Sequence, residues 1–384
     1  MHRLLKQAAA LLLAISFIIP QMGCSSNGQN QNYTGISKTG FYLDTICSIT
    51  VYGVHPESVL GHELAAAADE QEQQKLVHQL ITDAFLECAR YESLLSKTIE
   101  TSEISQINDA SGAAVEVSTE TAEVIEKGIW YGQVSDGLFD ITIGKASQLW
   151  DFHEAEAVAG DASAAESLLP DEAELEDAVK HVDYTEVKVR GLSVSLADPE
   201  MEIDLGGIAK GYIADRVTDF LEARGVVSAV VDLGGNIVTI GSKTSEILPG
   251  LDYDTVTTSP FHIGIKDPQS EIGELLAVFP AADKTVVTSG TYERFLIQDG
   301  VKYHHILDPA TGWPIDSDVL SVTIIAPKGS AVDADGLSTT CLALGVKKGM
   351  ELIESLPSPK VEAVFVDTDC QIHKTSGAPE LKTN

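Results

Sequence analysis

Three observations indicate an α+β protein. The chain has 384 residues, of which 44% are hydrophobic, enough for one large or two modest cores. Short runs of strand character alternate with segments of helical spacing, which favours helices layered on β-sheets. One short apolar strand, Glu202 to Leu205, is expected to meet Gly206-Gly207 and enter a helix from about 208 to 224, which Gly225 ends.

The start of the chain has the pattern of an export signal. Basic residues precede an apolar run from Ala8 to Ile19, which is too short to span a bilayer comfortably. Cys24 follows this run and indicates a lipoprotein site, at which residues 1–23 are removed and Cys24 carries the lipid. Removal of an ordinary signal peptide without lipid is the alternative. Residues 24–38 are then a polar tether, and residues 39–384 form an extracytoplasmic domain anchored to the membrane.

The chain is strongly acidic, with a formal net charge of −33 at pH 7. This charge argues against a nucleic-acid partner, because phosphate backbones bind basic surfaces. It also makes a bound divalent cation the natural means of holding an anionic ligand. Two acidic segments look like additions to the core: residues 57–74 are predicted to extend the helix that continues to Leu95, and residues 155–180 to form an exposed helical excursion. Residues 243–260 are predicted as a surface loop.

Cysteine and glycine patterns argue against two common kinds of site. The cysteines after Cys24 have no short spacing, which argues against zinc. Buried free thiols are expected at Cys47 and Cys341. No GxGxxG sequence occurs, so a Rossmann-type nucleotide site is not indicated.

The segment from Asp333 to Gly345 begins like a helix N-terminus and continues as an apolar helix. Asp335 and Thr339 are four residues apart and therefore share a helix face. A carboxylate and a hydroxyl on one face can hold a hard cation such as Mg²⁺, and the helix N-terminus favours a phosphate. Metal plus phosphate is the first hypothesis. An acidic first turn leading into a buried helix is the alternative.

The junction at Gly206-Gly207 is a second candidate for ligand binding. Glycines there let a ligand approach the backbone and leave its amide and carbonyl groups accessible. Lys210 lies one turn into the following helix, from where it could reach an anion. The alternative is a tight turn with a solvated lysine.

Two histidines mark a third candidate. His304 and His305 precede the rigid turn 308–312 and follow a predicted hairpin with an Asp299-Gly300 turn. Because neighbouring residues on a strand point to opposite faces, only one of the two rings can face a site, where it could titrate near neutrality. A hairpin with one packed and one exposed histidine is the alternative.

In this order, the motifs resemble the ApbE family, whose members are FAD:protein FMN transferases. The resemblance runs from about Thr39 to about Asp367 and includes Leu43-Asp44-Thr45, Ser102 to Asn108 and Gly137 to Thr142. It implies the ApbE-like fold of the α+β class, with two lobes of mixed β-sheets and flanking helices and the flavin between the lobes. The segment Ser96-Lys97-Thr98 departs from the family, which often has a tyrosine there that stacks on FAD.

The resemblance also implies roles for individual residues. Mg²⁺ is expected on Asp335, Thr339 and the backbone carbonyl of Gly207, with Asp333 orienting the ligands. His305 is expected to be the catalytic base, with His304 as the fallback. The residues expected to contact FAD are Leu43, Leu138, Phe139, Asp140, Asp204, Lys210 and Ile306.

The function implied is Mg²⁺-dependent transfer of FMN from FAD to a threonine of an acceptor flavoprotein, with release of AMP. The acceptor is expected to present a Ser/Thr-Gly-Ala-Thr-like segment and to be a membrane redox subunit or an extracytoplasmic flavoprotein. Two alternatives remain. The first is an FAD pyrophosphatase, in which water replaces the threonine. The second is a non-catalytic flavin-binding lipoprotein, which would not need Asp335, Thr339 and His305 together.

Overall fold

The computed structural model describes residues 35–150, 152, 168–244, 258–270, 273–357 and 360–383. The expected signal peptide, the lipid site at Cys24 and the tether up to residue 34 lie outside this part of the chain. Residues 155–167 of the acidic excursion and residues 245–257 of the predicted loop lie outside it as well. Within the described ranges, no helix combines the length and apolar character that a membrane span requires.

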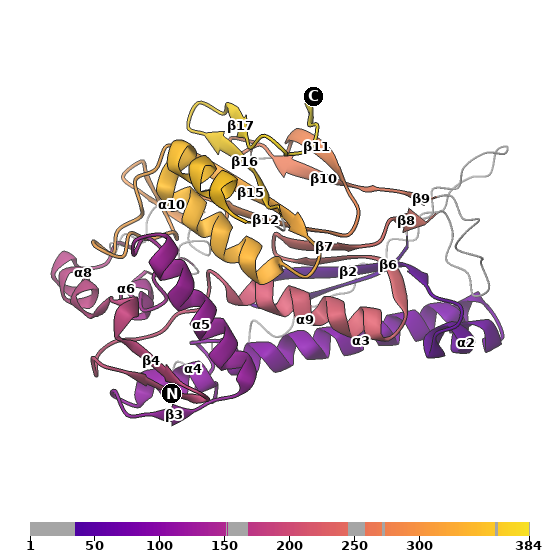
Figure 1. Cartoon of the computed structure of the whole chain (residues 1–384), viewed down its shortest axis with the longest axis horizontal. Coiled ribbons are helices and arrows are strands. Elements are labelled where there is room, and N and C mark those ends of the chain that lie inside the picture. Colours follow the sequence, from indigo (N-terminus) through magenta and orange to yellow (C-terminus); the bar gives the residue numbers. More distant parts are fainter. Residues whose placement is uncertain are drawn as a thin grey trace. The chain divides into compact units, whose positions relative to one another are not determined.

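A sheet of eight strands organises the fold, in the order β1-β2-β6-β7-β12-β15-β16-β17 (Figure 1). The predicted α+β class is confirmed, but the strands pair antiparallel, which differs from the mixed sheets that the resemblance implies. Tight turns such as Leu43-Asp44 and Gly234-Gly235 join neighbouring strands and so reverse the chain. The strands are β1 (Ile36–Tyr42), β2 (Thr45–Val54), β6 (Val226–Leu233), β7 (Asn236–Ile240), β12 (Lys284–Gly290), β15 (Val319–Pro327), β16 (Glu362–Asp367) and β17 (Ile372–Lys374).

Helices cover one face of this sheet and a smaller sheet covers the other. Helix α9 (Ala209–Ala223) packs on β6 and β7, α10 (Ala331–Ser355) packs on β12 and β15, and α3 (Glu70–Leu95) packs on β1 and α9. Figure 1 shows α9 and α10 running along the sheet. On the other face, a second apolar core around Phe279 joins the large sheet to a small one. The small sheet contains β10 (Phe261–Lys266), β11 (Leu275–Ala281) and β18 (Lys382–Thr383).

Of the remaining elements, α2, β8 and β9 lie at one end of the view in Figure 1, whereas several others, among them α4, α6, α8, β3 and β4, lie around α5. A third apolar cluster, which includes Trp150, Leu175 and Leu307, lies in this part of the chain. Other elements are α2 (Val59–Ala66), α4 (Glu103–Asp109), β3 (Val115–Glu116), α5 (Thr119–Val134), α6 (Gly144–Gln148), α8 (Glu172–Ala178), η2 (Val179–His181), η3 (Tyr184–Glu186), β4 (Val187–Arg190), β5 (Ser193–Leu196), β8 (Lys243–Thr244), β9 (Thr258–Ser259), β13 (Phe295–Gln298) and β14 (Val301–His304).

The sequence pattern predicts that the acidic segment near residues 57–74 extends the long helix, but the structure shows a break there. The segment contains α2 and the first turn of α3, with the break between them. At the break, Asp69 has an extended backbone, and its side chain accepts a hydrogen bond from the amide of Glu72 at 2.9 Å. This N-cap starts a new helix, which explains the interruption.

The apolar segment before Gly206 is not the strand that its pattern predicts. Only Glu202 forms a bridge, an isolated one to Ile143. The side-chain amide of Asn108 donates to the carbonyl oxygen of Ile203 at 3.0 Å and accepts from its N–H at 2.7 Å. A side chain therefore satisfies the backbone groups that a neighbouring strand would otherwise pair.

Helices α9 and α10 cross close to their N-termini, and each caps the other. Asp215 of α9 accepts hydrogen bonds from the amides of Ala331 (3.0 Å) and Val332 (3.1 Å) at the start of α10. Asp335 of α10 accepts one from the amide of Gly211 (2.8 Å), in the first turn of α9. The first two amides of α10 are therefore already bonded to Asp215 and are not free for the phosphate that the sequence pattern favours at this N-terminus.

Replacing Asp215 should change the pH dependence of stability. Asp215 is 3% exposed, and burial raises its pKa to about 6, although its two backbone hydrogen bonds oppose the rise. A raised pKa means that the group stabilises the fold most below its unfolded pKa, and that this contribution is lost as the pH rises through about 6. We therefore expect the free energy of unfolding, measured with urea, to fall between about pH 4 and about pH 7. This fall should be about 2 kcal/mol larger in the wild type than in Asp215→Asn.

The control for this experiment is Asp219→Asn, on the exposed side of the same helix. It should leave the free energy of unfolding within about 0.5 kcal/mol of the wild type at both pH values. An identical pH dependence for the wild type and Asp215→Asn would contradict the raised pKa of Asp215.

Candidate active site

The predicted motifs meet at one edge of the large sheet, where several strands end. Cys47 pairs with Leu233 and Asn236 pairs with Val287, so the β1–β2 turn, the β6–β7 turn and the end of β12 share this edge. Helix α10 reaches the same edge, because Asp335 lies against Asn236 at the start of β7. Residues from four distant parts of the sequence are thereby assembled.

The three residues expected to hold a cation come close together. The hydroxyl oxygen of Thr339 lies 3.8 Å from the point where a side chain on Gly207 would begin. Asp335 is one turn before Thr339 on the same face of α10. Thr339 Oγ1 also lies 3.4 Å from the hydroxyl oxygen of Ser289 on β12. Carboxylate, hydroxyl and carbonyl oxygens are hard donors, which suit Mg²⁺ or Ca²⁺ better than a softer metal.

The two oxygens of the buried Asp335 carboxylate face different elements. Oδ2 accepts from the amide of Gly211, whereas Oδ1 lies 3.4 Å from the side-chain nitrogen of Asn236. Burial raises the pKa of Asp335, and the nearby Lys210 with the bonds from Gly211 and Asn236 opposes the rise. Asn236 is itself 1% exposed, and its Oδ1 has no hydrogen-bond partner in the described part of the chain.

His305 has the geometry of a neutral base. Its Nδ1 lies 3.1 Å from the backbone carbonyl oxygen of Arg294. A carbonyl only accepts, so Nδ1 carries the proton and Nε2 the lone pair. Burial lowers the pKa of His305 to about 3; the bond to Arg294 opposes this, and the charges of Lys210 and Arg294 add to it. In contrast, Nδ1 of His304 accepts a hydrogen bond from the backbone amide of Ile306 at 3.3 Å, so this ring is held by the loop that follows it.

Arg294 connects this histidine to the β1–β2 turn. Its guanidinium donates to the backbone carbonyl oxygen of Asp44 at 2.6 Å and pairs with the Asp44 carboxylate at 3.2 Å. In that turn, Leu43 has a φ of 54° and donates its amide to the carboxylate of Glu92 at 3.0 Å. Leu43 and His305 are therefore held by one set of contacts, although 262 positions separate them in the numbering.

Lys210 and Glu293 add two charged groups to the same site. Nζ of Lys210 lies 3.1 Å from the backbone carbonyl oxygen of Gly206. Glu293 reaches solvent, yet the protein packed around its carboxyl raises its pKa to about 7; Lys210 opposes this rise and Asp335 adds to it. A group that titrates near neutrality therefore stands near the predicted cation residues.

Asp204 is already paired within the protein. Its carboxylate lies 3.0 Å from Nζ of Lys97 and accepts from the hydroxyl of Ser147 and the amide of Gly206, both at 2.8 Å. Burial alone would raise its pKa, but the Lys97 charge and these hydrogen bonds hold the pKa below its usual value. The segment that lacks the expected tyrosine thus contributes a cation in its place.

Two further acidic residues make structural contacts. Asp140 accepts from the amide and the hydroxyl of Thr142 with one oxygen (2.8 and 2.7 Å) and from an amide of η3 with the other (2.9 Å). Asp333 accepts from Nζ of Lys127 (2.6 Å) and the hydroxyl of Tyr131 (3.0 Å). Asp140 therefore fixes a turn, and Asp333 ties α10 to α5.

Phe139, Leu138 and Ile306, three of the apolar residues predicted to contact FAD, are buried or partly buried. Phe139 is buried, and its ring lies 3.0 Å from the point where a side chain on Gly207 would begin. Leu138 is partly buried against the main core, and Ile306 is buried within it. Phe139 therefore packs against Gly207, one of the residues predicted to hold the cation.

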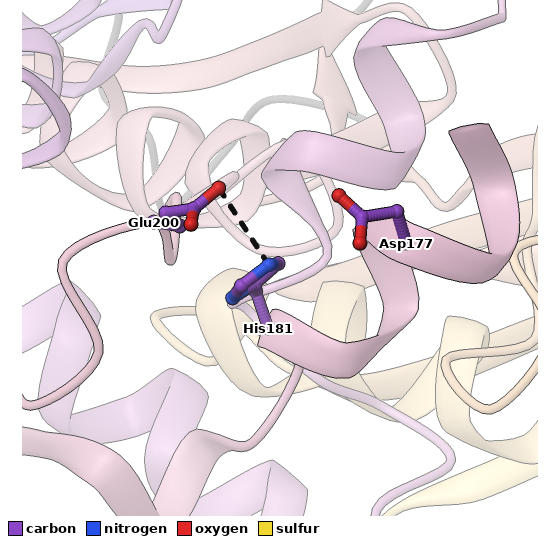
Figure 2. Close-up of side chains that lie close together, drawn as sticks. All are labelled: Asp177, His181 and Glu200. Carbon is purple, nitrogen blue, oxygen red and sulfur yellow. Dashed lines mark ion pairs between the residues drawn. The ribbon is translucent and has the colours of Figure 1, made fainter.

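A separate group of possible metal ligands lies at Asp177, His181 and Glu200, whose side chains converge in Figure 2. Among the described His, Cys, Asp and Glu side chains, this is the one trio whose ligand atoms lie within 4.8 Å of each other. His181 pairs with Glu200 at 3.7 Å, but Nζ of Lys145 lies 2.7 Å from Glu200 and 4.0 Å from Asp177. Because a lysine already supplies the positive charge, we interpret the trio as a surface ion-pair network.

Several site residues have no role in the sequence-based prediction. Asn236 follows Gly234-Gly235, whose φ values of 63° and 89° mark a tight turn; a polar residue directly after such a turn is the signal that would have found it. Glu293 and Arg294 directly precede the predicted hairpin, whose first strand starts at Phe295. Lys97 has no local signal, since its partner Asp204 is 107 positions away.

Comparison with known proteins points to one family. The model of the ApbE family matches residues 43–365. An FAD:protein FMN transferase of Treponema pallidum (strain Nichols) is 32% identical over 363 residues, covering 92% of this chain and 91% of that protein. One of Klebsiella pneumoniae (strain 342) is 35% identical over 282 residues, covering 72% and 78%.

Solved structures give the same result. The ApbE protein of Thermotoga maritima has a TM-score of 0.68 at 29% identity, covering 88% of this chain and 96% of that one. The flavin transferase ApbE from Vibrio cholerae has a TM-score of 0.68 at 27% identity, covering 89% and 97%.

A double-mutant cycle should show that Lys97 and Asp204 are coupled. Lys97→Met leaves a largely enclosed carboxylate without its cation, and should lower the free energy of unfolding at neutral pH by about 2 kcal/mol, less than for a fully buried pair because both side chains retain some solvent contact. In the double variant, Asp204→Asn should recover part of the stability lost in Lys97→Met. We expect a coupling free energy between the two residues of about 1 kcal/mol, measured by urea unfolding.

The same cycle at low pH provides the check. Because the pKa of Asp204 is lowered in the fold, its stabilising contribution is present above its unfolded pKa and lost as the pH falls through the folded one. The coupling should therefore shrink on acidification. A coupling that is absent at neutral pH, or unchanged in acid, would contradict the ion pair.

Proposed function

The chain belongs to the ApbE family and is a flavin transferase, and we propose that it moves the FMN part of FAD onto a threonine hydroxyl of an acceptor flavoprotein in a Mg²⁺-dependent reaction. One observation carries this proposal. Asp335, Thr339 and Gly207 converge at the sheet edge, and the charge of Lys210 acts on both Asp335 and His305. Oxygen donors for a cation and a neutral base therefore belong to one site.

The reaction forms one bond and breaks another at phosphorus. The threonine oxygen bonds to the phosphorus on the riboflavin side of the FAD pyrophosphate, and the bond from that phosphorus to the bridging oxygen breaks. AMP leaves with the bridging oxygen, and the threonine proton passes to Nε2 of His305. If water took the place of threonine, the products would be free FMN and AMP.

The donor set of the site fits a hard divalent cation. Asp335 would supply its Oδ1, Thr339 its hydroxyl oxygen and Gly207 its backbone carbonyl oxygen. When bound, Mg²⁺ would neutralise the pyrophosphate charge and favour the departure of AMP. Lys210 and Arg294 would hold the anionic substrate with the chain's own positive charge, in a protein whose overall charge repels it.

His305 would receive the proton of the attacking hydroxyl. Its low pKa keeps the ring neutral in the free protein, and the bond from Nδ1 to Arg294 leaves the lone pair on Nε2. Anionic FAD nearby would raise the pKa of His305 and so strengthen the base when substrate is present. His304 remains the alternative, but its Nδ1 is engaged by the loop.

FAD would lie along the residues that the family resemblance names. The charge of Lys210 acts on Asp335, and Phe139 packs against Gly207. Both residues therefore stand close to the residues predicted to hold the cation. Asp204, kept ionised by Lys97, would accept hydrogen bonds from FAD. Asp140 would act through the turn that presents Leu138 and Phe139, since both its oxygens are already bonded. Leu43 and Ile306 would complete the list of FAD contacts.

The acceptor and the location are proposals that the sequence alone supports. The acceptor would be a membrane redox subunit or an extracytoplasmic flavoprotein with a Ser/Thr-Gly-Ala-Thr-like segment. A lipid on Cys24 would hold the enzyme at the outer side of the membrane, next to such acceptors. The apolar run followed by Cys24 is the support for this anchor.

Thr339→Val tests the cation site with little change of shape. It should lower FMN transfer at least tenfold, because it removes a ligand hydroxyl. Asp335→Asn should abolish Mg²⁺-dependent turnover. The measurement is mass spectrometry of a threonine-containing acceptor domain after incubation with the protein, FAD and Mg²⁺, which should reveal the mass of one FMN. The adduct should not form in EDTA.

Thr340→Val is the matched control. Thr340 follows Thr339 in the sequence, and its hydroxyl is buried without a hydrogen-bond partner within the described ranges. Removing this hydroxyl should leave FMN transfer close to that of the wild type. Equal activity of Thr339→Val and Thr340→Val would remove Thr339 from the cation site. Free FMN and AMP with no adduct on any of several acceptors would identify a pyrophosphatase.

His305→Gln should slow transfer by about 10² to 10⁴-fold while FAD binding is retained, because a positioned base contributes about that much. His304→Gln should change the rate only a few-fold. Because burial lowers the pKa of His305 to about 3, protonation of this residue should not reduce kcat/KM until the pH falls well below the usual histidine range. A larger loss in His304→Gln than in His305→Gln would move the base to His304.

A further inference from the structure

The amide of Asn236 is buried at the centre of the site with its hydrogen-bonding capacity almost unused. Asn236 is 1% exposed and stands at the start of β7, where the sheet edge meets α10. Its nitrogen lies 3.4 Å from Oδ1 of Asp335, which is long for a hydrogen bond. Its carbonyl oxygen has no partner among the residues that the structure describes.

A buried amide with one weak contact is unfavourable unless something else satisfies it. An asparagine side chain can make four hydrogen bonds, two as donor and two as acceptor, and a buried polar group without partners destabilises the fold. The oxygen and nitrogen of the amide have nearly the same size. Which of the two atoms faces Asp335 therefore depends on the groups that lie beside them. A cation next to Asp335 would select the orientation with the oxygen facing it.

We propose that the side-chain oxygen of Asn236 is a further ligand of the divalent cation at Asp335, an inference that rests on the proposed function. Neighbouring oxygen ligands lie about 2.9 Å apart around an octahedral Mg²⁺ ion and somewhat farther apart around Ca²⁺. The side-chain nitrogen of Asn236 lies 3.4 Å from Asp335 Oδ1, so turning the amide over would bring its oxygen close to this spacing. The cation would thereby connect the sheet edge, through Asn236, to α10, through Asp335 and Thr339.

The chemistry of an amide also suits this position. A neutral ligand leaves more of the cation's positive charge for the FAD pyrophosphate than a second carboxylate would. Asn236→Asp should therefore bind the divalent cation at least as tightly as the wild type and bind FAD more weakly. Asn236→Leu, which keeps approximately the same volume, should lose the ligand.

Binding of Mn²⁺, a paramagnetic substitute for Mg²⁺, tests the inference without relying on activity. We would titrate the purified protein with Mn²⁺ in the absence of FAD and measure free Mn²⁺ by electron paramagnetic resonance. Asn236→Leu should raise the Kd at least tenfold, whereas Asn236→Asp should not. Without metal, the Tm of Asn236→Leu should equal or exceed that of the wild type, because an unsatisfied amide has been removed.

Two further variants separate the possible failures. Thr285→Val removes a buried hydroxyl, also unpaired in the described part of the chain, from β12, and should bind Mn²⁺ like the wild type. Asp335→Asn should lose binding. Wild-type affinity in Asn236→Leu together with loss in Asp335→Asn would overturn the role of Asn236 and leave the proposed function standing. Wild-type affinity in Asp335→Asn, or no binding by the wild type, would overturn both.

Discussion

The crossing of α9 and α10 is the contact on which both the fold and the site depend. Two helix N-termini carry partial positive charge and repel each other, and here Asp215 and Asp335 each neutralise the end of the opposite helix. The approach is possible because Gly211 has no side chain: a Cβ there would lie 2.1 Å from the carbonyl oxygen of Ala331. The same crossing turns the free oxygen of Asp335 toward the sheet edge, so one carboxylate serves stability and function.

The charges of the site are arranged against the charge of the chain. The protein has a formal net charge of −33, yet Lys210, Arg294 and Lys97 all lie among the residues predicted to hold FAD or to act on it. Lys97 neutralises Asp204. Burial raises the pKa values of Asp335 and Glu293, and the charge of Lys210 opposes that rise. Burial lowers the pKa of His305, and the charge of Lys210 adds to this fall. The distant acidic surface is screened by solvent and salt, whereas these few cations act at short range. An acidic protein can therefore still bind an anionic substrate.

Reactive groups at this edge are held through the backbone as well as through side chains. The carbonyl oxygen of Arg294 fixes the ring of His305, while the guanidinium of Arg294 holds the carbonyl oxygen of Asp44. The β1–β2 turn and the hairpin before His305 are consequently coupled by one residue. Hydrogen bonds to rigid turns of this kind hold a base in the tautomer that leaves Nε2 available, which a solvent-exposed histidine would not maintain.

The sequence by itself determined the features that arise from short-range chemistry. The α+β class, the end of α9 shortly before Gly225, the β13–β14 hairpin with its Asp299-Gly300 turn, and the common face of Asp335 and Thr339 all follow from spacing and turn residues. Only the tertiary structure decided which polar groups meet. Asp215 caps a helix 116 positions away, and Asn236 meets Asp335 across 99 positions. Local preference carries no information about such partners, because their proximity results from strand register and helix crossing.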